Sequence, residues 1–110
     1  MHVIGDVTDK IAIVVDDMID TAGTMCAAAD VLIANGAKEV MACTTHPVLS
    51  GPAIDRLCKS SFSKVFVTDT IELGDKIDRC DKLEVLSIAG LLAKAIHNIH
   101  TESSVSVLFV

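Results

Sequence analysis

The sequence predicts an α/β fold in which a doubly wound, mainly parallel sheet forms the middle of three layers, α/β/α. Short apolar runs alternate with segments whose apolar residues have helical spacing, which is typical of parallel sheets with helical crossovers. Hydrophobic residues make up 51% of the chain and aromatic residues 3%, so the core must be aliphatic. The 110 residues are enough for one domain, residues 1–110, but few for a complete metabolic enzyme.

Charge and cysteine usage exclude several classes of protein. The net charge is −6 and lysines and arginines form no run, so we expect neither nucleic acid nor a membrane surface as a partner. No apolar run approaches the ~20 residues that span a bilayer, and the first residues do not resemble a signal peptide. The four cysteines show no Cys-x-x-Cys spacing, which favours reduced thiols in a cytoplasmic protein.

The order of the predicted elements follows from changes in apolar spacing. Residues 11–15 are a fully apolar run, typical of a strand buried on both faces. Helical spacing begins at Thr24, and Asn35-Gly36 predicts the end of that helix. Further strands are expected at 40–45, 65–68, 84–86 and 105–110. A short helix is expected after Ser50-Gly51-Pro52, a long final helix after Ser87, and a charged surface loop at 71–82.

Two adjacent acids, Asp16 and Asp17, follow the first predicted strand. In open α/β sheets, ligands bind beyond the carboxyl ends of the strands, and these acids lie at that end. Neighbouring carboxylates repel each other, so both stay ionised readily only beside a cation or vicinal hydroxyl groups. Ribose supplies such hydroxyls and Mg²⁺ supplies such a charge.

The segment that follows the acids has the composition of an anion-binding turn. Thr21 and Thr24 supply hydroxyl groups, Gly23 permits close backbone approach, and the next helix offers its free N–H groups. The turn contains no lysine or arginine. A phosphate here would be held by amides and hydroxyls, which suits a single terminal monophosphate.

Residues 14–24 resemble the phosphoribosyl pyrophosphate loop of the type I phosphoribosyltransferase fold, in the version found in ribose-phosphate pyrophosphokinases. The resemblance continues through residues 44–53, 67–71 and 104–109. It implies the reaction of ATP with ribose 5-phosphate to give AMP and phosphoribosyl pyrophosphate, with Mg²⁺ neutralising charge on the transferred group. It also implies that ribose 5-phosphate and phosphoribosyl pyrophosphate are ligands and that the protein is a homo-oligomer.

The resemblance assigns roles to ten residues. Asp16 and Asp17 would hold the ribose hydroxyls directly or through Mg²⁺, and Asp20, Thr21, Ala22, Gly23 and Thr24 would enclose the 5-phosphate. Ser104, Ser106 and Phe109 match positions that, in the phosphate-regulated class of this family, help form an allosteric ADP or phosphate site between subunits.

The family's enzymes are longer, two-domain chains, and the resemblance places this chain at their C-terminal part. Their ATP-binding residues and basic catalytic loop lie in the first part, so ATP and ADP would bind through residues outside this chain. Transfer of a diphosphoryl group needs cationic groups around the transition state, and the predicted site supplies none. We therefore assign no catalytic residue here and expect sugar-phosphate binding without synthesis.

Two other functions are compatible with the same loop. A salvage phosphoribosyltransferase would need a platform for a base, and none is evident among Phe62, Phe66 and Phe109. A non-catalytic regulatory partner of a synthetase would be expected to have a degraded loop, whereas this one is intact. His46 is interpreted as a turn histidine and Asp69 as a helix or turn cap.

Overall fold

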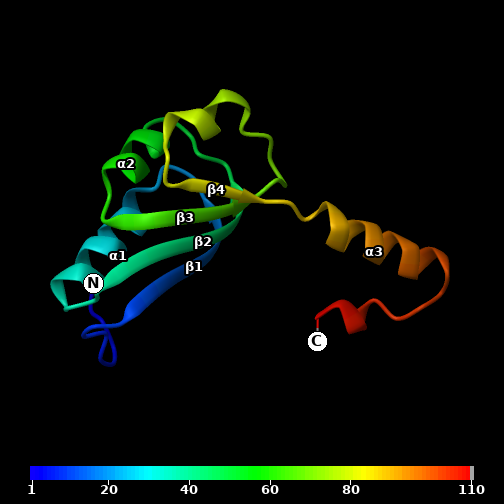
Figure 1. Cartoon of the computed structure of the whole chain (residues 1–110), viewed down its shortest axis with the longest axis horizontal. Helices are drawn as coiled ribbons and strands as arrows, with labels where there is room; N and C mark the ends of the chain where they lie inside the picture. Colours follow the sequence, from blue (N-terminus) through cyan, green and yellow to red (C-terminus); the bar gives the residue numbers. More distant parts are fainter. Residues whose placement is uncertain (110) are drawn as a thin grey trace.

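Four parallel strands form the sheet of the computed structural model, which describes residues 1–109 (Figure 1). The strands are β1 (Ile11–Ile19), β2 (Glu39–Pro47), β3 (Phe62–Thr68) and β4 (Leu83–Leu86). The helices are α1 (Gly23–Ala34), α2 (Ala53–Lys59) and α3 (Ala89–His100), with 3-10 helices η1 (Gly74–Arg79) and η2 (Ser106–Phe109). The predicted α/β class and parallel sheet are confirmed, and η1 lies inside the segment expected to be an irregular loop.

The sheet has the order β1-β2-β3-β4, which follows the chain without a reversal. A doubly wound sheet consists of two halves that run in opposite directions, so the described residues contain one such half. Its core lies between the sheet and α1 and α2, which pack together. The opposite face is open, because Ile11, Ile13 and Val15 are 53%, 60% and 76% exposed. Residues 1–109 therefore form two of the three expected layers.

The end of α1 is fixed by a glycine, as the sequence predicts. Gly36 has a φ of 98°, its N–H donates to the Ile33 carbonyl, and the Ala37 N–H donates to the Leu32 carbonyl. These two bonds are the Schellman arrangement, which satisfies the last carbonyls of a helix and requires a left-handed residue. The turn also sends the chain directly into β2.

α3 projects away from the sheet and none of its residues is buried (Figure 1). Its apolar side chains are exposed, at 68% for Ile96 and 67% for Ile99. The radius of gyration is 16.3 Å, whereas a compact 100-residue domain has about 13 Å. The start of the helix is attached near the end of β3, because the N–H of Ile88, the residue before α3, donates to Asp69 Oδ1 at 2.9 Å.

The predicted terminal strand at residues 105–110 is wrong over the described residues. Residues Ser106–Phe109 form η2 instead, and Val110 lies outside the described residues. The Ser103 N–H donates to the Asn98 carbonyl at 2.7 Å, and the Asn98 amide donates to the Ser104 carbonyl at 2.8 Å. These bonds fold the chain back onto α3, which holds it away from the sheet edges. Apolar composition alone could not reveal this.

No helix within residues 1–109 has both the length and the apolar character that crossing a bilayer requires.

Candidate functional site

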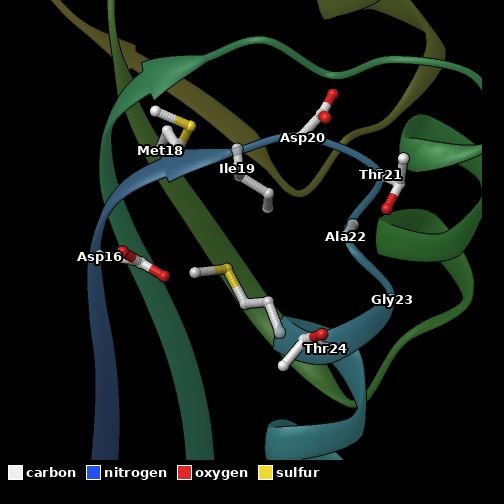
Figure 2. A pocket seen from close by; sticks show the side chains of 9 residues that line it. Asp16, Met18, Ile19, Asp20, Thr21, Ala22, Gly23 and Thr24 are labelled. Carbon is white, nitrogen blue, oxygen red and sulfur yellow. The ribbon is translucent and has the colours of Figure 1, made fainter.

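A cavity of about 200 Å³ lies where β1 ends and α1 begins (Figure 2). Most of the residues that line it belong to the β1–α1 turn (residues 20–24) or to the end of β1. Its walls are formed by Asp16, Met18, Ile19, Asp20, Thr21, Ala22, Gly23, Thr24 and Met25. The structure thus brings together six of the seven residues predicted to bind the sugar phosphate.

The β1–α1 turn leaves backbone N–H groups available for a ligand. Ala22 precedes α1 with φ 68° and ψ 4°, a left-handed conformation that is uncommon without glycine. No side chain caps the helix, although the first N–H groups of a helix have no partner within it. A left-handed residue beside helical ones also turns successive N–H groups to one side, as in anion-binding nests. The turn therefore has the geometry to bind an anion through its backbone.

The two acids of β1 differ in their position. Asp16 lines the cavity, whereas Asp17 is not among the lining residues. The Asp17 N–H donates to Asp16 Oδ1 at 2.8 Å, which orients the Asp16 carboxylate. Successive side chains of a strand point to opposite faces, which agrees with the different positions of these two acids.

The carboxylates at the cavity are suited to a shared Mg²⁺ and not to a metal cage made by the protein alone. Asp16 and Asp20 are the acids among the lining residues. Within residues 1–109 no group of three or more His, Cys, Asp or Glu side chains could hold a metal ion. Mg²⁺ often uses one or two carboxylates and takes its other ligands from substrate phosphates and water, so this donor set fits it.

Arg56 is a cation at the turn that the sequence analysis did not identify. It comes from α2, and its Nη1 donates to the Thr21 carbonyl at 3.0 Å. A Cβ placed on Gly23 would lie 3.2 Å from the same nitrogen. Helices of successive parallel crossovers lie side by side. The sequence could therefore have indicated that a basic residue of α2 lies next to α1.

Polar residues at the ends of β2 and β3 hold this edge of the sheet together. His46 Nδ1 is hydrogen-bonded to Thr70 Oγ1 at 2.9 Å, and the Thr68 hydroxyl donates to the Thr45 carbonyl at 2.6 Å. His46 lies within β2, near its end, and not in a turn as the sequence predicted; its bond to Thr70 links the ends of β2 and β3. Thr44 is 5% exposed, and its hydroxyl oxygen has no partner within the described residues.

Asp69 caps the start of the segment that leads into α3. The Ser87 hydroxyl donates to the Asp69 carboxylate, and so does the Ile88 N–H. These two bonds hold the pKa of Asp69 below its usual value, and the bond from Ser87 has the larger effect. No side chain of the described residues caps α3 itself, so Asp69 holds the residue before the helix and not its first turn. Asp69 therefore links β3 to α3 and is not one of the residues that line the cavity.

The three residues implied in allosteric binding lie beyond α3, away from the cavity. The Ser104 and Ser106 hydroxyls are hydrogen-bonded to each other at 2.8 Å, and Phe109 is 75% exposed. Their role stays a prediction. The four cysteines are free thiols, with Cys80 buried and Cys58 exposed.

The fold and the cavity define an α/β protein with a parallel sheet and an uncapped helix start at its first crossover turn. The family model of the phosphoribosyl synthetase-associated domain matches residues 1–110, so the chain belongs to that family. The ribose-phosphate pyrophosphokinase of Caldanaerobacter subterraneus is 54% identical over 109 residues, and that of Xylella fastidiosa is 51% identical over 110 residues.

A solved structure agrees with this family. The fold is similar to the crystal structure of phosphoribosylpyrophosphate synthetase from Mycobacterium smegmatis, with a TM-score of 0.83 and 42% identity; the match covers 91% of this chain and 33% of that one. The matches with the two relatives cover 99% and 100% of this chain and 34% of each relative. The chain thus spans about a third of their length. The expected C-terminal position is not supported by these matches.

Proposed function

We propose that this chain is the ribose 5-phosphate-binding part of a ribose-phosphate pyrophosphokinase. The observation that carries the proposal is the cavity at the β1–α1 turn. It places two acids, two threonines and uncapped helical N–H groups around one small volume. Relatives about half identical over the whole chain bear the name ribose-phosphate pyrophosphokinase.

In this proposal the two ends of the ligand meet different parts of the site. The 5-phosphate lies in the turn, where the N–H groups at the start of α1 and the hydroxyls of Thr21 and Thr24 donate to it. The ribose ring extends toward β1, where the Asp16 carboxylate accepts hydrogen bonds from its vicinal hydroxyls. A monophosphate fits because the N–H groups at the start of α1 can all donate to a single phosphate group.

Mg²⁺ is part of the proposal as an ion that Asp16 and the substrate would coordinate together. When bound, it would neutralise negative charge on the transferred diphosphoryl group. The chain's own residues bind and orient the sugar phosphate. ATP and the basic groups that stabilise its transfer are proposed to bind to the other two-thirds of a complete enzyme.

Calorimetry with the 110-residue chain tests the binding part of the proposal. We expect ribose 5-phosphate with Mg²⁺ to bind, and ribose, which lacks the phosphate, to bind at least about tenfold more weakly, since charge-assisted hydrogen bonds contribute ~1.5–3 kcal/mol each. Equal binding of the two sugars would contradict it. Incubation with ATP, Mg²⁺ and ribose 5-phosphate should yield no AMP, and AMP formation would show that the chain is catalytically complete.

The two alternative functions predict different results in related assays. A salvage phosphoribosyltransferase would release diphosphate from phosphoribosyl pyrophosphate in the presence of a purine or pyrimidine base. A regulatory partner would change the activity of a full-length synthetase without binding ribose 5-phosphate itself. The oligomeric assembly and the proposed allosteric role of Ser104, Ser106 and Phe109 can be tested by sedimentation with and without ADP.

A further inference from the structure

Arg56 makes the connection between α2 and the β1–α1 turn. Its guanidinium Nη1 donates to the Thr21 carbonyl across 35 residues of sequence, at 3.0 Å. The ion pairs of the described residues join Lys64 to Glu84 and Arg79 to Asp55. Arg56 is in neither of them, so its charge is not neutralised by a carboxylate there.

The bond to Thr21 fixes the direction of the next N–H group. The Thr21 carbonyl and the Ala22 N–H belong to one peptide unit, and none of the described peptide bonds is cis. In a planar trans peptide the C=O and N–H groups point in opposite directions. Arg56 is not among the residues that line the cavity, so it holds the carbonyl on the outer side of the turn and leaves the N–H free on the side of the cavity.

Gly23 provides the space for this contact. Its φ is not in the left-handed range, so its small size, and not its backbone freedom, is what the site uses. A Cβ on this residue would lie 3.2 Å from Arg56 Nη1 and 3.8 Å from Arg56 Cζ. The guanidinium therefore lies directly behind the first residue of α1.

We propose that Arg56 is a positioning residue for the anion site. It acts from behind the β1–α1 turn, where it orders the Thr21–Ala22 peptide and adds one positive charge to a turn that has no cation of its own. The inference rests on the proposed function for the identity of the ligand, a sugar phosphate. Its structural part, the ordering of the turn, concerns the chain without any ligand.

Two measurements on Arg56→Met test these two parts separately. NMR order parameters of the unliganded chain should fall at residues 21–24 from about 0.85 to below about 0.6, while those of the strands stay unchanged. The affinity for ribose 5-phosphate should fall about tenfold, and that for ribose should stay the same. Arg56→Lys should recover part of the affinity, because it keeps the charge without the planar guanidinium.

Lys59→Met is the matched control, since it removes a positive charge from the last turn of the same helix. We expect it to leave both the order parameters and the affinity unchanged. Unchanged order parameters in Arg56→Met, or an equal effect of both variants, would overturn the inference. If the unmodified chain fails to bind ribose 5-phosphate, the proposed function is wrong, while the order parameters still decide the role of Arg56.

Discussion

The backbone N–H of Asp17 donates to Oδ1 of Asp16 at 2.8 Å, and only Asp16 lines the cavity. Resemblance to the family implied one shared role for this pair. The strand geometry divides it, because neighbouring side chains of β1 point to opposite sides of the sheet. One acid is therefore available to a ligand in the cavity, and the other contributes through its backbone.

Substitution of each acid by its amide should separate these roles. We expect Asp16→Asn to weaken binding of ribose 5-phosphate with Mg²⁺ by about tenfold or more, since hydrogen bonds to charged groups contribute ~1.5–3 kcal/mol. Asp17→Asn keeps the backbone N–H, so calorimetry should show a loss of less than about threefold. Equal losses would mean that both carboxylates contact the ligand.

Gly23→Ala should weaken ribose 5-phosphate binding by displacing Arg56, whose Nη1 would lie 3.2 Å from the new Cβ. Because this loss comes from the same contact, we expect the double variant Gly23→Ala with Arg56→Met to bind no more weakly than the weaker of the two single variants. Calorimetry on the three variants gives this double-mutant cycle. Additive losses would show that Gly23 and Arg56 act independently.

The attachment of α3 should depend on pH through Asp69. Hydrogen bonds from Ser87 and Ile88 lower the pKa of this carboxyl in the folded chain, relative to about 3.9 in an unfolded chain. A lowered folded pKa means that the contact is fully stabilising above the unfolded pKa and is lost as the pH falls through the folded pKa. The Ile88 amide chemical shift, followed by NMR from about pH 6 to 2, should therefore report a midpoint below the usual aspartate value.

Ser87→Ala is the control for that titration. It removes the main cause of the lowered pKa, so the midpoint should move up toward the ordinary value. An Asp69 midpoint at or above the ordinary value in the unmodified chain would show that the carboxylate does not hold the start of α3.

Truncation of an apolar side chain should destabilise the protein more in the core than in α3. Leu57 of α2 is fully buried, whereas Ile96 of α3 is 68% exposed. Leu57→Ala should lower the free energy of unfolding by about 2–5 kcal/mol, and Ile96→Ala by less than about 0.5 kcal/mol, as measured by urea denaturation. A comparable loss in both would mean that α3 packs against an apolar surface in solution.

The alternation of apolar runs was sufficient to predict the four strands of the sheet, their parallel direction and the crossover helices α1 and α2. The end of α1 was predictable because Gly36 must adopt a left-handed conformation, a local requirement. Six residues of the cavity were predictable because residues adjacent in sequence form one turn.

Long-range relationships were not predictable from such local patterns. Arg56 contacts a carbonyl 35 residues away, and no motif around it indicates that contact. The sequence 105–110 is apolar like a buried strand, but a strand also needs a neighbouring strand edge, and the bonds around Asn98 hold the chain after α3 beside that helix up to Phe109. The outward direction of Asp17 depends on the strand continuing to Ile19, beyond its apolar part.

The central claim is that the β1–α1 turn binds the phosphate of a sugar phosphate through its backbone. An NMR titration of the chain with ribose 5-phosphate and Mg²⁺ tests it most directly, with ribose as the matched ligand that lacks the phosphate. The account predicts that the amide signals of Ala22, Gly23 and Thr24 shift most, and that ribose leaves them unchanged. Unchanged signals in this turn at saturating ribose 5-phosphate, or equal shifts with ribose, would contradict it.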